Sequence, residues 1–137
     1  MKRVLFVCVA NSGRSQMAEA FFNYFAKGWA RAESAGTSPS PRINPLIVQI
    51  MSEVGIYLSD KQPKLLTDEM LKQADIVITM GCEVRAACPA TFTNTVDWEL
   101  EDPSRKPIEV MRKIRDEIKD KVLQLLEELQ SAQRALE

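Results

Sequence analysis

Short apolar runs alternate with longer amphipathic segments along this chain. Residues 2–7 form a short, β-branched apolar run that is typical of a buried strand, and residues 75–80 form a second one. Residues 30–35 and 95–98 are shorter candidates for strands. Four segments of the chain between and after these runs predict helices: residues 16–27, residues 44–54, a short one starting at residue 67, and residues 108–129.

Polar and small residues mark the ends of these predicted helices. Ser15 and Thr67 stand where capping residues are expected, and Gly28 and Gly55 follow the last positions of two helical patterns. The tail at residues 131–137 is expected to fray. These boundaries leave the residues after each predicted strand in loops.

Strands that alternate with helices predict an α/β fold, a three-layer sandwich in which a four-stranded parallel sheet carries helices on both faces. We expect residues 1–137 to form one domain. Ligands of such sheets bind beyond the carboxyl ends of the strands. Cys8, Cys82 and Asp102 each follow a predicted strand, so the topology predicts that they meet at one edge.

The composition and net charge of the chain limit the partners that we expect for it. The chain is 45% hydrophobic and 27% charged with a net charge of −1, so neither nucleic acid nor an anionic membrane is an expected partner. No apolar run is long enough to cross a bilayer, and the N-terminal run is interpreted as a strand rather than a signal peptide. We therefore expect a cytoplasmic protein, and a monomer.

The chain has three cysteines and no histidine. This excludes Cys–His and Ser–His–Asp catalysis and imidazole metal ligands. Three scattered cysteines without a Cys-x-x-Cys pair fall short of a structural zinc site. We expect no metal and no cofactor.

The segment between Cys8 and Ser15 is the strongest candidate site. It begins where a strand ends and leads into a helix, so its main-chain N–H groups and the helix N-terminus can hold a tetrahedral oxyanion. Arg14 adds a fork of donors that can grip two oxygens. The same field should stabilise a thiolate at Cys8, and Ser15 could donate a hydrogen bond to it. The oxyanion-binding loop comprises Val9, Ala10, Asn11, Ser12, Gly13, Arg14 and Ser15.

A buried cysteine with an unrelated surface arginine is the alternative interpretation of this loop. The strand before it and the helix after it favour an active site. Asp102, stiffened by the proline that follows it, is the best candidate for the acid that protonates a departing oxygen. Asp97 and Glu101 compete for that role, and the alternative interpretation of residues 99–102 is a solvated acidic turn.

Cys82 and Cys88 are the other two thiols. Each could be a small buried hydrophobic residue. They are also near enough in sequence to pair after a local rearrangement and to pass oxidation outward by successive thiolate attack.

The loop and its continuation, residues 8–19, resemble the thioredoxin-coupled arsenate reductases, which share a fold with the low-molecular-weight protein tyrosine phosphatases. Ser104 stands where the phosphatases usually carry a tyrosine after Asp-Pro, so the aromatic ring that stacks on phosphotyrosine is missing. Gly13 stands where many reductases carry another cysteine. The resemblance extends through residues 33–37, 75–82, 87–89 and 97–103.

This resemblance implies an arsenate reductase. Cys8 would attack arsenic(V) held by the loop, with Asp102 as the acid. Cys82 would then form a disulfide with Cys8, and Cys88 would move the disulfide to Cys82–Cys88 for reduction by thioredoxin. Arsenate is the implied substrate and phosphate or sulfate the competing oxyanions. A glutaredoxin or another thiol donor stays open.

Two other functions remain open: a phosphatase that forms a phosphocysteine at Cys8, and a non-catalytic oxyanion sensor. The two extra cysteines favour the reductase, and the complete set of nucleophile, arginine and acid disfavours the sensor. Some of the resembling enzymes bind potassium near the residues matching Asn11, Glu19 and Ser34, with an aspartate at about the position of Lys64. A lysine there could supply the positive charge itself, so we expect no potassium requirement.

Overall fold

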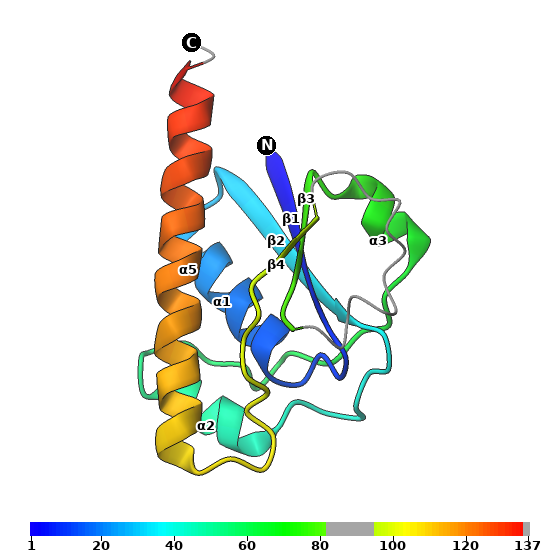
Figure 1. Ribbon diagram of the computed structural model, residues 1–137, viewed down its shortest axis with the longest axis vertical. Helices are drawn as coiled ribbons and strands as arrows, with labels where there is room; N and C mark the ends of the chain where they lie inside the picture. The colour runs from blue at the N-terminus through cyan, green and yellow to red at the C-terminus, as the bar shows by residue number, and fades with distance from the viewer. Residues whose placement is uncertain (82–94, 136–137) are drawn as a thin grey trace.

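A four-stranded parallel sheet is the centre of the computed structural model, which describes residues 1–81 and 95–135. The strands are β1 (Lys2–Cys8), β2 (Ala30–Gly36), β3 (Ile76–Thr79) and β4 (Thr95–Asp97). They lie in the order β2-β1-β3-β4, and every neighbouring pair is parallel (Figure 1). The predicted parallel sheet is therefore confirmed, with β1 in its interior.

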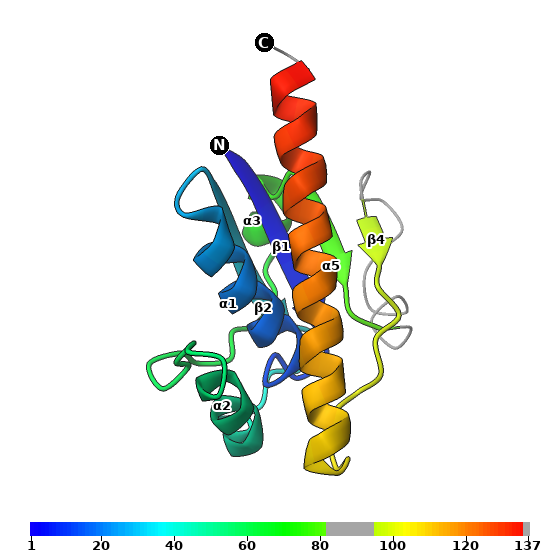
Figure 2. The same cartoon turned by 90° about the vertical axis from the view of Figure 1, so that its left-hand side faces the viewer.

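Helices cover both faces of this sheet, as predicted. Helix α3 (Asp68–Gln73) lies on one face, whereas α1 (Arg14–Ala26) and α5 (Ile108–Ala135) lie on the other, with α2 (Pro45–Ser52) packed beside α5 (Figures 1 and 2). The three layers place the carboxyl ends of β1 and β3 on the same edge, where the loop after Cys8 begins.

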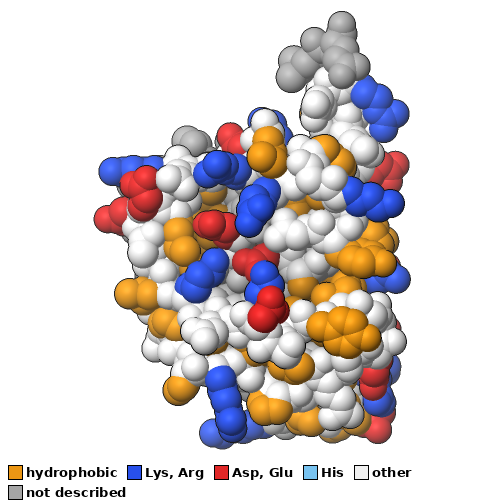
Figure 3. Space-filling model, turned by 180° about the vertical axis from the view of Figure 1, so that it is seen from behind, with side chains coloured by type: hydrophobic (Ala, Val, Ile, Leu, Met, Phe, Trp, Pro, Cys, Tyr) orange, Lys and Arg blue, Asp and Glu red, His pale blue; other side chains and the backbone are white. Residues whose placement is uncertain are grey.

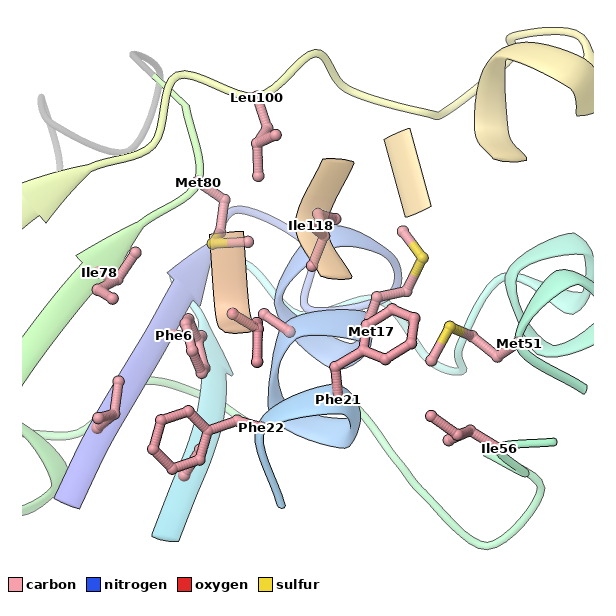
Figure 4. Close-up of a cluster of buried hydrophobic side chains, with 14 of the residues drawn as sticks. Phe6, Met17, Phe21, Phe22, Met51, Ile56, Ile78, Met80, Leu100 and Ile118 are labelled. Atoms are coloured by element: carbon pink, nitrogen blue, oxygen red, sulfur yellow. The ribbon is translucent and has the colours of Figure 1, made fainter. Parts of the chain in front are cut away.

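Side chains of β1 alternate between two buried clusters, as the two-residue period of a strand requires. Phe6 and Cys8 join the larger cluster, which contains side chains of α1, α2 and α5 (Figure 4). Leu5 and Val7 join the smaller cluster beneath α3, with Leu71 among its members. Burial on both faces explains the continuous apolar run at the start of the chain.

The first helix begins differently from the prediction. Its N-cap is Gly13 and no side chain caps it, so the expectation that Ser15 is the cap is wrong. Ser15 lies in the first turn, fully buried, and its hydroxyl is directed to Cys8 instead. Thr67 does cap its helix, because its Oγ1 accepts a hydrogen bond from the N–H of Met70.

Two other helix boundaries also differ. Asn44 is the N-cap of α2 rather than its first residue, and the helix ends at Ser52. Helix α5 continues to Ala135, so the expected fraying from residue 131 is wrong. The residues of that last segment are exposed but have high helix propensity, which allows the backbone ladder to continue beyond the apolar stripe. The end of α5 projects past the sheet (Figure 2).

The surface carries charges of both signs. On the face seen in Figure 3, basic and acidic side chains are interspersed and hydrophobic side chains are scattered between them. Among the described residues, no helix is both long and apolar enough to cross a membrane.

One ion-pair cluster joins the end of α2 to α5. The Glu53 carboxylate accepts hydrogen bonds from Arg112 at 2.7 Å and from Arg115 at 2.8 Å. The hydrogen bond from Arg112 is the main cause that lowers the pKa of the Glu53 carboxyl from its ordinary value of 4.5. A lowered folded-state pKa means that the pairing stabilises the fold above the pKa of the unfolded chain. That stability is lost as the pH falls through the folded-state pKa.

We therefore expect Glu53→Gln to lower the thermal unfolding midpoint at pH 7, and the deficit to shrink as the pH falls below about 4.5. Circular dichroism melts from pH 7 to pH 3 measure this. Glu117→Gln, at an exposed position of the same α5, is the control and should match the native protein at pH 7. A deficit of the same size at every pH would show that the charge of Glu53 is not what matters.

Candidate active site

Cys8 lies at the end of β1 and is buried, with 3% of its surface exposed. Its sulfur accepts a hydrogen bond from the main-chain N–H of Asn11 at 3.2 Å. The hydroxyl oxygen of Ser15 lies 2.8 Å from the same sulfur. The loop therefore folds back over the thiol.

The orientation of the Asn11 side-chain amide, which contacts Ser15, follows from its neighbours. The main-chain N–H of Lys64, which can only donate, lies 2.8 Å from Asn11 Oδ1. Gln16 Nε2 donates to the same oxygen at 3.1 Å. Asn11 must then turn its amide nitrogen to Ser15, where Nδ2 donates to Oγ at 2.7 Å. The hydroxyl hydrogen of Ser15 is therefore not used by Asn11 and is free to donate to Cys8, whose sulfur already accepts from the N–H of Asn11.

Close packing holds this loop in place. Asn11 is fully buried and has a left-handed backbone with φ 50°. A Cβ atom at Gly36 would lie 2.6 Å from the carbonyl oxygen of Val9 and 3.0 Å from the main-chain nitrogen of Asn11, so only glycine fits there. Ser38 and Ser40 donate main-chain hydrogen bonds to the carbonyls of Val9 and Ala10, both at 2.9 Å.

Arg14 joins this loop to two other segments. Its Nη1 donates to the carbonyl oxygens of Met80 and Leu100, both at 3.0 Å, and the residue is almost fully buried. Met80 follows β3 and Leu100 follows β4, so one guanidinium fixes two of the chain segments that leave the sheet at this edge. The sequence prediction that residues far apart in the chain meet here is confirmed for these described segments.

A cavity of about 540 Å³ opens over the loop. Cys8, Arg14 and Asp102 all line it, so the structure brings together the predicted nucleophile, arginine and acid. The N–H of Ser104 donates to Asp102 Oδ1 at 2.9 Å. A Cβ atom at Gly13 would touch Pro103 at 3.4 Å, so the loop that carries Asp102 lies directly against the oxyanion-binding loop. Val9, Ala10, Ser12, Gly13, Asn44, Ile47, Pro103 and Ser104 complete the lining.

The competing acids lie elsewhere. Asp97 Oδ1 accepts a hydrogen bond from Thr79 Oγ1 at 2.8 Å, within the sheet, and Glu101 is 3.7 Å from Lys106. Neither residue lines the cavity over Cys8. The geometry therefore favours Asp102 as the acid.

The other two thiols, Cys82 and Cys88, lie outside the described residues. Within residues 1–81 and 95–135, no group of three or more His, Cys, Asp or Glu side chains could hold a metal ion. Sequence reasoning missed Gly36 as a residue of the site, and it brought Lys64 near the site only through the family resemblance. The turn composition around Gly36 marked a loop, but no local pattern relates Lys64 to Asn11, 53 residues away.

Comparisons with known proteins fit this geometry. The model of the low molecular weight phosphotyrosine protein phosphatase family matches residues 3–135. The glutaredoxin arsenate reductase of Synechocystis sp. is 37% identical over 129 residues, which are 92% of this chain and 97% of that protein. This chain is also similar to solved structures, two of which are described next.

The thioredoxin-dependent arsenate reductase of Corynebacterium glutamicum is 38% identical, with a TM-score of 0.82 over 96% of this chain. This chain spans only 63% of that one. The arginine phosphatase of Geobacillus stearothermophilus is 27% identical with a TM-score of 0.87, covering 98% of this chain and 97% of that one. Reductases and phosphatases thus both share this fold.

The central place of Asn11 gives a stability prediction. We expect Asn11→Ala to destabilise the fold by about 2–4 kcal/mol, because it leaves the N–H of Lys64 without its acceptor and the buried hydroxyl of Ser15 without its donor. Asn11→Gly should cost about 1 kcal/mol less, since glycine tolerates the positive φ. Urea unfolding measures both. Ser12→Ala, in the same loop, is the control and should change the free energy of unfolding by less than about 0.5 kcal/mol. Equal effects of alanine and glycine would show that the left-handed backbone costs nothing here.

Proposed function

This chain belongs to the low molecular weight phosphotyrosine protein phosphatase family. Within that family, we propose that it reduces arsenate to arsenite. One observation carries the proposal: the sulfur of Cys8 accepts a hydrogen bond from the N–H of Asn11 and lies 2.8 Å from the Ser15 hydroxyl, at a cavity that Arg14 and Asp102 also line. Two compared relatives at 37% and 38% identity are named arsenate reductases. Cys82 and Cys88 supply the two further thiols that reduction requires.

The first step is a substitution at arsenic. The loop N–H groups and Arg14 hold the oxyanion, and the Cys8 thiolate attacks arsenic(V). An As–S bond forms while one As–O bond breaks. Asp102 donates its proton to the departing oxygen, which leaves as water.

Electron transfer occurs in the second step. The Cys82 thiolate attacks the sulfur of Cys8, so an S–S bond forms and the As–S bond breaks. The bonding pair stays on arsenic, which leaves as arsenite in the +3 state. Cys88 then attacks Cys82, forms the Cys82–Cys88 disulfide and releases Cys8 as a thiolate. An external dithiol reduces that disulfide and completes the cycle.

The contacts of Arg14 support this relay. Met80, which accepts a hydrogen bond from Arg14, stands two residues before Cys82 in the sequence. The chain therefore lies beside the oxyanion-binding loop at Met80, and the described residues before Cys82 end one residue later, at Gly81.

We propose thioredoxin as the external dithiol, since the Corynebacterium relative is thioredoxin-dependent by name. The Synechocystis relative carries glutaredoxin in its name, so a glutaredoxin is the alternative donor. We expect the protein to act in the cytoplasm as a monomer, without cofactor.

A phosphatase is the second candidate function. The family and the similar arginine phosphatase favour it, because the same loop and acid can form and protonate a phosphocysteine. Ser104 lines the cavity where an aromatic ring would stack on a phosphotyrosine, and this residue counts against that substrate.

Cysteine variants separate the two functions. Cys8→Ser should abolish both arsenate reduction and hydrolysis of an aryl phosphate, because both need the nucleophile. Cys82→Ser and Cys88→Ser should stop arsenate turnover but keep any residual phosphatase activity. The measurement is NADPH oxidation with thioredoxin, thioredoxin reductase and arsenate, beside an aryl phosphate assay.

A parallel assay with glutaredoxin and glutathione identifies the donor. Normal cycling of Cys88→Ser with thioredoxin would contradict the three-thiol relay. Rapid aryl phosphate hydrolysis without arsenate turnover in the native protein would favour the phosphatase.

Asp102 can be tested on the first step alone. We expect Asp102→Asn to slow single-turnover formation of the arsenic–cysteine bond by roughly 10²- to 10⁴-fold, the usual contribution of a general acid. Glu101→Gln, the neighbouring carboxylate paired with Lys106, is the control and should keep the native rate. An unchanged rate for Asp102→Asn would move the acid role to another group.

A further inference from the structure

The mechanism leaves one buried carboxylate without a role. Glu19 lies on α1, one turn after Ser15, and only 7% of it is exposed. Its Oε1 accepts a hydrogen bond from the hydroxyl of the fully buried Ser34 at 3.1 Å. An ionised carboxylate in such a place is costly unless a positive charge compensates it.

Lys64 supplies that charge. Its Nζ lies 4.0 Å from Glu19 Oε1, and both residues line a polar cavity of about 370 Å³. Gln16 lines it too, and its buried Oε1 accepts no hydrogen bond within the described residues. At 4.0 Å the contact between Lys64 and Glu19 is an ion pair without a hydrogen bond, so the ammonium group acts on the carboxylate through its charge.

The main chain of Lys64 contacts the oxyanion-binding loop directly. Its N–H donates to Asn11 Oδ1 at 2.8 Å, and its carbonyl accepts from the N–H of Gly36 at 2.8 Å. The side chain therefore anchors to α1 the same residue whose main chain orients Asn11. Through Asn11 and Ser15, the position of Lys64 sets the donors that reach Cys8.

We propose that Lys64 is a positioning residue whose ammonium group is a built-in cation for the oxyanion-binding loop. It compensates Glu19, fixes the segment that holds Asn11, and so keeps the loop in its binding shape. The proposal rests on the proposed function only in taking this loop as the oxyanion site.

This role conflicts with the potassium ion that the family resemblance implies here. Both lone pairs of Asn11 Oδ1 are used by N–H donors, and the hydroxyl of Ser34 is turned to Glu19. At residue 64 an ammonium stands where the resembling enzymes carry a carboxylate. The residues present therefore do not fit a potassium site, and the ammonium group of Lys64 supplies the positive charge that the ion would supply.

The test uses inorganic phosphate as the probe, on the reduced full-length protein. Phosphate protects Cys8 from iodoacetamide, and peptide mass spectrometry of Cys8 alkylation gives the Kd. Each protein is measured in potassium chloride and in choline chloride at the same ionic strength. Circular dichroism confirms that each variant is folded. Arsenate and thioredoxin are absent, so a failure of the proposed reductase activity leaves this test unaffected.

We expect the native protein to bind phosphate equally in both salts. Lys64→Ala should bind up to about tenfold more weakly in choline, the equivalent of one lost hydrogen bond. Lys64→Arg should restore the native Kd, because it returns the charge. Lys64→Asp should bind phosphate weakly in choline chloride and regain its affinity for phosphate in potassium chloride. Lys61→Ala removes another lysine from the same cavity and should behave as the native protein.

Three results would overturn the proposal. The first is tighter phosphate binding by the native protein in potassium than in choline. The second is a Lys64→Ala variant that binds phosphate as the native protein does in choline. The third is a Lys64→Asp variant that stays equally weak in both salts, which would show that the position needs the lysine chain rather than a positive charge.

Discussion

The fixed orientation of the Asn11 side-chain amide is the constraint on which the rest of the site depends. A main-chain N–H cannot accept, so the contact from Lys64 determines the orientation of the Asn11 amide. In that orientation the amide nitrogen donates to Ser15, and the hydroxyl hydrogen of Ser15 is free to donate to the sulfur. Cys8, Asn11 and Ser15 are all buried, so a reversed amide would place like partners together at the cost of unsatisfied polar groups. The thiol environment is therefore set by the fold and not by a mobile side chain.

Arg14 has a comparable role on the other side of the loop. A parallel sheet delivers the carboxyl ends of its strands to one edge, but does not by itself hold the segments that leave them. The two carbonyls bound by Nη1 come from segments after β3 and β4. Leu100 stands two residues before Asp102, so the arginine that lines the cavity also anchors the loop that carries the acid. Removing this side chain would disturb more than one step of the chemistry.

The sequence predicted the parallel sheet, the helices on both faces and the convergence of Cys8 and Asp102, because strand periods and strand ends are local signals. It ranked Asp102 above Asp97 only on the proline that follows Asp102, since both lie in or just after the last predicted strand. The structure separates them because Asp97 lies inside β4 and bonds Thr79. Of the two roles that the sequence suggests for Ser15, the structure shows the contact with Cys8 and not the helix cap. The contact between Lys64 and Glu19 spans 45 residues and has no local signature at all.

One fold serving both reductases and phosphatases is explained by the chemistry of the second step. Arsenate and phosphate are both tetrahedral oxyanions, and a thiolate, an arginine and an acid activate either one alike. Arsenic(V) can accept two electrons when a second thiolate attacks the cysteine sulfur, whereas phosphorus(V) is not reduced by thiols and its phosphocysteine needs water. The loop therefore fixes only the first step. The fate of the cysteine adduct depends on whether further thiols reach the sulfur, and for that reason we expect Cys82 and Cys88, rather than the oxyanion-binding loop, to distinguish the two functions.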